Sequence, residues 1–129
     1  MVKPIEYADA NVEVRAVFDE IMAARGVRDV NNFWKYLAHD PVELRSVWDT
    51  LRDVMADGAL SPEVKELIYV AVSIANGCDY CVASHSAAAA ARGATPDMLN
   101  EMRRIVAMAS RTNALAVSLR VPVDPQFEG

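Results

Sequence analysis

The chain has 129 residues, with 13 Lys and Arg against 18 Asp and Glu, and hence a formal net charge of −5 at pH 7. Hydrophobic residues make up 53% of the sequence, which excludes intrinsic disorder as the main state. The basic residues do not cluster, and this argues against electrostatic binding of nucleic acid. Glu66 and Asp79 bracket the longest apolar run, which is too short to span a membrane. With no secretory signal over residues 1–15, we expect a cytoplasmic protein without a membrane partner.

Helix start and stop signals recur along almost the whole chain. Apolar spacing, capping residues, prolines and glycines predict helices over residues 12–25, 31–38, 41–56, 61–75, 78–93 and 95–110, the last continuing with a kink to 119. The expected caps of the third, fourth and sixth helices are Asp40, Ser61 and Thr95. No segment shows the sustained alternation of a strand, and we find no internal repeat. The sequence therefore predicts an all-α fold, a helical bundle that forms a single domain over residues 1–129.

The number of apolar side chains leaves two packing interpretations open. Trp34, Trp48, six Met and many aliphatic residues exceed what a small helical monomer usually hides. They either fill the core of one chain densely or lie partly in an interface between subunits. We expect both tryptophans and His39 to lie in the core or in such an interface.

The motif Cys78-Asp79-Tyr80-Cys81 begins the helix predicted over residues 78–93. Helical geometry places Cys81 about 60° from Cys78 and His85 about 40° from Cys81, all on one face. Two helical Cα atoms at this spacing lie within disulfide range, so the cysteines can cross-link reversibly. A helix N-terminus favours the thiolate, and His85 can exchange a proton with a thiol.

Glu66 is the candidate partner for the second ring nitrogen of His85. If Asn76-Gly77 reverses the chain, the two helices become antiparallel, with Glu66 about 16 Å and His85 about 12 Å from the turn. A long side chain bridges that offset. The alternative is that Glu66 is an ordinary solvated residue. A zinc site would need further ligands that the spacing does not supply, so we expect no metal.

The pattern Glu66, eleven residues, Cys78-x-x-Cys81-x-x-x-His85 and then Gly93 resembles the alkylhydroperoxidase D-like (AhpD-like) branch of the carboxymuconolactone decarboxylase superfamily. The likeness covers about residues 40–118, which we take as the domain core, with residues 1–39 as an N-terminal helical extension. It implies an all-helical fold with the CxxC at the start of a central helix. It also implies trimers or hexamers, and an antioxidant, thiol-dependent peroxidase that reduces a hydroperoxide.

The resemblance also implies roles for the site residues. Cys81 would be the attacking thiolate, oxidised to a sulfenic acid, and Cys78 the resolving thiol that closes the disulfide. Glu66 and His85 would form the proton relay that activates Cys81. No bound cofactor is implied, but an external dithiol or protein reductant is required. The helix dipole alone would instead select Cys78 as the more acidic thiol.

Tyr80 departs from the family pattern, because the best-characterised peroxidases of this branch have a histidine immediately before the second cysteine. A phenol donates a hydrogen bond but does not shuttle protons freely at pH 7, so weaker peroxidase activity or a different substrate is expected. Alternatively, Tyr80 only packs at an interface. Two rival functions remain open: a carboxymuconolactone decarboxylase-like lyase, and a non-enzymatic redox-sensing or interaction module.

Overall fold

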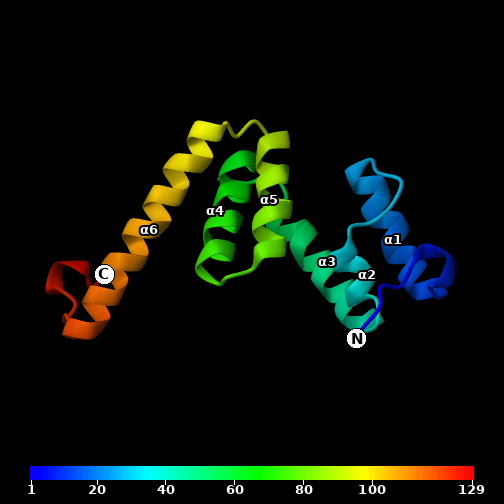
Figure 1. The fold of residues 1–129 in the computed structure, drawn as a ribbon, viewed down its shortest axis with the longest axis horizontal. Coiled ribbons are helices and arrows are strands. Elements are labelled where there is room, and N and C mark those ends of the chain that lie inside the picture. Colours follow the sequence, from blue (N-terminus) through cyan, green and yellow to red (C-terminus); the bar gives the residue numbers. More distant parts are fainter. The chain divides into compact units, whose positions relative to one another are not determined.

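The fold consists of helices joined by short loops (Figure 1). The computed structural model describes residues 1–129 and contains no strand. Its α-helices are α1 (Val12–Arg25), α2 (Asn32–Leu37), α3 (Pro41–Met55), α4 (Pro62–Ala75), α5 (Asp79–Ala91) and α6 (Pro96–Leu119). Short 3-10 turns lie at Tyr7–Asp9 and Pro125–Phe127. The predicted all-α fold, with the CxxC at the start of a helix, is confirmed.

The chain divides into two compact units, residues 1–56 and 57–129. This division falls after α3, whereas the sequence predicts an extension that ends at residue 39. The single domain over 1–129 stays a prediction. None of the helices combines the length and the apolar character that crossing a membrane requires.

Most helix starts are explained by local capping. Asn11 accepts a hydrogen bond from the backbone N–H of Val14, Asp40 caps the first turn of α3, and Thr95 accepts from the N–H of Met98. These bonds satisfy N–H groups that lack a partner inside the helix. The sequence also predicts Ser61 as a cap, but its side chain makes no capping bond. Here α4 begins at Pro62, whose fixed φ suits a first helical position.

The first unit holds the larger hydrophobic core. Helices α1 and α2 both pack on α3, and Trp34 and Trp48 meet edge to face with ring centroids 5.7 Å apart. Both tryptophans are buried, as predicted for core residues. His39 is exposed instead, and its Nε2 lies 2.6 Å from the carbonyl oxygen of Lys3. The other buried apolar residues of this core are Ala10, Val14, Val17, Phe18, Ile21, Val30, Ala38 and Leu44.

A buried lysine ties three segments of the first unit together. The Nζ of Lys35 donates to Oε2 of Glu6 and to Oδ2 of Asp29, each at 2.7 Å. Lys35 is 7% exposed, so its charge depends on these two acids for compensation. The hydrogen bonds that Lys35 donates to Asp29 and Glu6 raise the pKa of Lys35. The hydrogen bond from Lys35 in turn lowers the pKa of Asp29.

The second unit is built on an antiparallel hairpin of α4 and α5, with α6 packed against α4 (Figure 1). Its buried apolar residues are few: Val70, Ala89, Ala94 and Met102. Beyond Met102, α6 is exposed almost throughout and continues to Leu119, as the sequence predicts; the kink expected after residue 110 stays a prediction. The hairpin carries the residues that the sequence singles out.

Candidate active site

A tight turn between α4 and α5 brings the candidate residues together. Gly77 adopts a left-handed φ of 70°, which glycine reaches without a steric penalty. Its N–H donates to the carbonyl of Ile74 at 3.1 Å, and the N–H of Cys78 donates to the carbonyl of Ser73 at 3.0 Å. These two bonds form a Schellman motif, which ends α4 and satisfies its last carbonyls. The chain therefore reverses within two residues.

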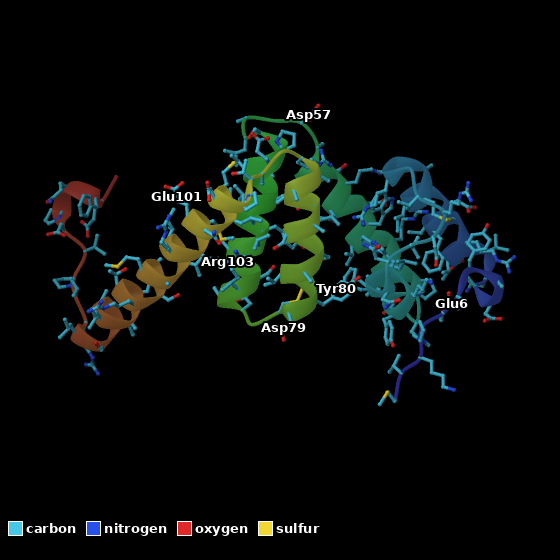
Figure 2. The ribbon with its side chains drawn as sticks, turned by 45° about the horizontal axis from the view of Figure 1, so that its top comes forward. Glu6, Asp57, Asp79, Tyr80, Glu101 and Arg103 are labelled. Carbon is cyan, nitrogen blue, oxygen red and sulfur yellow. A yellow bond between two sulfur atoms is a disulfide. The ribbon has the colours of Figure 1, made fainter.

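Cys78 serves as the N-cap of α5, and Cys81 lies in the first turn. The backbone N–H of Cys81 donates to the sulfur of Cys78 at 3.2 Å. The two cysteines form a disulfide, with their Cα atoms 5.3 Å apart. Figure 2 shows this bond at the end of α5 that carries Asp79 and Tyr80. Both cysteines are partly exposed, so a small reagent can approach them.

Glu66 and His85 meet across the hairpin. The Oε2 of Glu66 lies 2.7 Å from the Nδ1 of His85, although the residues are 19 positions apart in sequence. Glu66 is 6% exposed, which rules out the alternative of a solvated surface acid. Because a carboxylate accepts, Nδ1 donates the proton and Nε2 is left as the basic nitrogen. His85 lies one turn after Cys81 on the same helix.

Tyr69 is a member of this group that the sequence analysis did not identify. Its ring is stacked on the imidazole of His85, with centroids 3.6 Å apart and an angle of 18° between the planes. Tyr69 follows Glu66 by three positions on α4, so both project from one face of the helix. That spacing is visible in the sequence, but an aromatic residue within the apolar run Leu67 to Ile74 is more typical of a core position.

Tyr80 is 44% exposed and lies in the first turn of α5, directly before Cys81. Its effect on reactivity stays a prediction. No group of three or more His, Cys, Asp or Glu side chains is placed to hold a metal ion.

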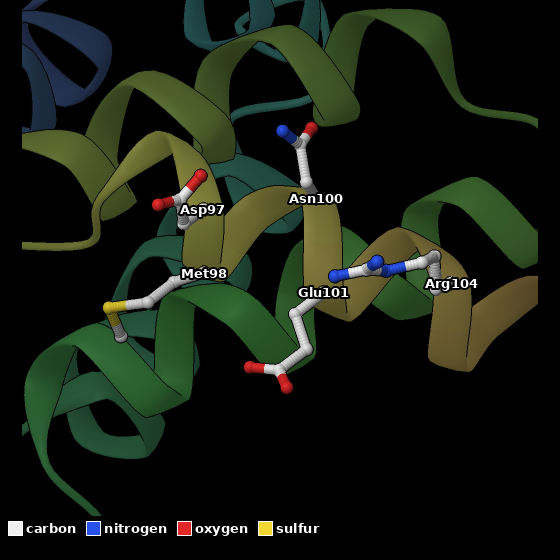
Figure 3. A pocket seen from close by; sticks show the side chains of 5 residues that line it. All are labelled: Asp97, Met98, Asn100, Glu101 and Arg104. Carbon is white, nitrogen blue, oxygen red and sulfur yellow. The ribbon is translucent and has the colours of Figure 1, made fainter.

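A shallow pocket lies on the first turns of α6, separate from the cysteines. It is lined by Asp97, Met98, Asn100, Glu101 and Arg104, which Figure 3 shows as neighbours along one helix. In Figure 2, Glu101 lies toward the end of the hairpin opposite Asp79 and Tyr80. This pocket contains neither a cysteine nor a histidine, and we assign it no role in the chemistry.

The hairpin thus places a disulfide-bonded cysteine pair one helical turn from a histidine that contacts a buried glutamate. A helix N-terminus stabilises a thiolate, because its unpaired N–H groups point toward the sulfur. An imidazole whose Nδ1–H is held by a carboxylate can take a proton at Nε2 and carry the resulting charge. This arrangement suits reactions in which a thiol is deprotonated, oxidised and then reduced again.

The sequence and the fold both resemble those of known proteins. Residues 42–124 match the carboxymuconolactone decarboxylase family. The crystal structure of the alkylhydroperoxidase AhpD core from Rhodospirillum rubrum superposes with a TM-score of 0.86 at 49% sequence identity, covering 89% of this chain and 85% of that one.

Two curated relatives show how far along the chain the similarity extends. Alkyl hydroperoxide reductase AhpD of Anaeromyxobacter dehalogenans is 34% identical over 124 residues, covering 88% of this chain and 62% of the relative. A protein of Paracoccus denitrificans, described as uncharacterized protein 4 in cox locus, is 39% identical over 71 residues and covers 50% of this chain and 64% of its own length. The chain therefore spans less than two thirds of the length of these curated relatives.

Proposed function

Because this chain belongs to the AhpD-like branch of the carboxymuconolactone decarboxylase family, we propose that it is a thiol-dependent peroxidase that reduces an organic hydroperoxide to the alcohol. The observation that carries the proposal is the 2.7 Å hydrogen bond between His85 and Glu66, one helical turn from a disulfide-forming cysteine pair. A structural disulfide has no need of an oriented base beside it. No bound cofactor takes part.

In the oxidative half of the proposed reaction, Nε2 of His85 takes the proton of the Cys81 thiol. The Cys81 thiolate attacks the terminal oxygen of the hydroperoxide, and the O–O bond breaks as the S–O bond forms. The alkoxide leaves and receives the proton from His85, giving the alcohol and a sulfenic acid on Cys81. Cys78 then attacks the sulfur of Cys81, releasing water and closing the disulfide.

In the reductive half, an external dithiol attacks the disulfide and is itself oxidised to a disulfide, which restores both thiols. The overall balance is hydroperoxide plus dithiol giving alcohol, water and oxidised dithiol. If the reductant attacks Cys81, the leaving group is the Cys78 thiolate. The N–H of Cys81, 3.2 Å from that sulfur, stabilises the leaving thiolate.

The capping geometry does not by itself identify the nucleophile. Cys78 receives the helix N–H, so the dipole argument again selects Cys78 as the better thiolate. Cys81 has the base one turn away on its own helix. We assign the attack to Cys81, because proton removal by His85 is the step that the Glu66 contact supports.

We also propose that the chain forms homo-oligomers. Helices α4 and α6 expose Ile68, Val72, Ile105, Met108 and Leu115, each at least 48% accessible in the isolated chain. At spacings of three, four and seven, they form apolar stripes that a second copy can cover. Light scattering coupled to size exclusion tests this, and a mass of one chain would overturn it.

The central test is consumption of an organic hydroperoxide driven by a dithiol, comparing the native protein with Cys81→Ser and Cys78→Ser. We expect sustained turnover in the native protein and none in either variant. Tyr36→Leu, at an exposed position on α2, serves as a control for substitution elsewhere and should retain turnover. The peroxidase proposal would be overturned if the native protein shows no turnover and its thiols react no faster than a free cysteine. That result would favour the lyase or the non-enzymatic module.

A further inference from the structure

Tyr69 lies face to face with the imidazole that the proposed chemistry protonates. The two rings are 3.6 Å apart between centroids and 18° from parallel. At this separation the rings overlap almost fully, without the offset that neutral aromatic pairs prefer. A stack of this kind becomes favourable when one ring is positively charged, because the face of the phenol ring carries negative potential.

We propose that Tyr69 is a positioning residue that fixes the plane of the His85 ring and stabilises its protonated form, and this inference rests on the function proposed above. Glu66 holds the ring at one atom, through Nδ1. A single hydrogen bond still allows the ring to rotate about it. Tyr69 removes that freedom by contacting the whole face of the ring, so the two contacts together set the direction of Nε2.

Both contacts come from the same rigid support. Glu66 and Tyr69 lie three positions apart on α4, and α4 is the helix packed directly on α5. The Schellman turn at Gly77 fixes the register of the two helices. A substitution at Tyr69 therefore changes the environment of His85 without removing its hydrogen-bond partner.

Charged and titratable groups near His85 come from α4 and from α5 itself. From α4, Glu66 bonds the imidazole and Tyr69 stacks on it, while Glu63 and Lys65 lie closer to the start of the helix. On α5 itself, Asp79 and Tyr80 lie in the first turn with the cysteine pair. Glu66 and the face of Tyr69 both favour a positive charge on His85. Removing the ring while keeping Glu66 separates the two effects.

The size of the expected effect follows from the interaction energy between a cation and the face of an aromatic ring. His85 has a side chain 19% exposed, between the exposed and the fully desolvated cases. The expected stabilisation of the protonated ring is about 3- to 30-fold in its equilibrium with the neutral form. Replacing Tyr69 by Leu should therefore remove this stabilisation of the protonated ring, whereas Tyr69→Phe should keep it.

The test is an NMR titration of the histidine side chains in the disulfide form, where no thiol titrates in the same range. The variants are Tyr69→Phe, which keeps the ring face, and Tyr69→Leu, which removes it. We expect the His85 midpoint to stay unchanged in Tyr69→Phe and to fall in Tyr69→Leu. His39, exposed in the other unit, is the internal reference and should not move.

This readout does not depend on peroxidase activity. If the native protein shows no turnover but the His85 midpoint shifts as described, the proposed function fails and the role of the ring stack is supported. If Tyr69→Leu keeps the native His85 midpoint, or if Tyr69→Phe shifts it as much as Tyr69→Leu does, the proposed role of Tyr69 is overturned. That conclusion holds whether or not the protein has peroxidase activity. Should Tyr69→Leu fail to fold, Tyr69→Met supplies a second ringless side chain of helix-forming type.

Discussion

Replacing Glu66 by Gln is the sharpest perturbation of the proposed relay. Glutamine keeps the length of the side chain and an oxygen that can accept from Nδ1 of His85, so the 2.7 Å contact can persist. What disappears is the negative charge that stabilises the imidazolium formed when His85 takes the thiol proton. The substitution therefore removes the negative charge of Glu66 while it keeps the shape of the side chain.

The expected loss follows from the difference between two kinds of hydrogen bond. A neutral hydrogen bond contributes about 0.5–1.5 kcal/mol, and one to a charged group about 1.5–3 kcal/mol. The difference of about 1–1.5 kcal/mol corresponds to roughly a tenfold lower rate of thiol oxidation. Glu66 is only 6% exposed, so water has little access to compensate and the larger value applies. Glu66→Ala also leaves Nδ1–H unpaired and should lower the rate about 10- to 100-fold.

The assay is a single-turnover reaction of the pre-reduced protein with an organic hydroperoxide, followed by rapid mixing. Single turnover isolates thiol oxidation from the reduction step. Glu63→Gln, which removes the same charge from the first turn of α4, is the matched control and should react at the native rate. If Glu66→Gln reacts within twofold of native while circular dichroism shows an intact fold, the relay does not limit thiol oxidation and the reasoning is refuted.

Three further predictions follow from other contacts. Cys78→Ser should consume one equivalent of hydroperoxide and stop, with a sulfenic acid on Cys81 that a dimedone-type probe labels; labelling of Cys78 in the Cys81→Ser protein instead would reverse the assigned roles. The hydrogen bond from Lys35 lowers the pKa of Asp29. The stability that this contact contributes is therefore present above the unfolded-state pKa of Asp29, and it is lost as pH falls through the lowered folded-state pKa of Asp29. The urea midpoints of native and Asp29→Asn proteins should therefore differ near about pH 6 and converge toward about pH 3, and a constant difference would contradict this. Gly77→Ala should destabilise the protein by about 1–2 kcal/mol in urea unfolding through its φ of 70° alone, because a Cβ there meets no atom within 4 Å, and an unchanged midpoint would show that the turn relaxes.

The helices could be predicted well where side-chain chemistry marks their ends. Asp40 and Thr95 cap the helices that they were expected to cap, because their short oxygen-bearing side chains reach the free N–H groups directly. The same logic failed at Ser61, where Pro62 alone begins the helix. The continuation of α6 to Leu119 is confirmed, and no proline or glycine interrupts residues 97–119.

The part of the candidate site that depends on the turn at Gly77 could be predicted from the sequence. Once Gly77 reverses the chain, helical rise alone brings Glu66 opposite His85, and the contact is observed. Tyr69 was not predictable in the same way. Its stack on His85 depends on the rotation of α4 about its own axis, which packing of the second unit decides and spacing alone does not.

The cysteine pair also has a thermodynamic consequence. The disulfide joins residues separated by only three positions, within a turn that backbone hydrogen bonds already hold. A cross-link stabilises a protein mainly by restricting the unfolded chain, and a loop this short restricts it least. Opening and closing the bond therefore changes the free energy of unfolding far less than a long-range disulfide would. In the proposed redox cycle, the helices rather than the sulfur bond hold the architecture in both oxidation states.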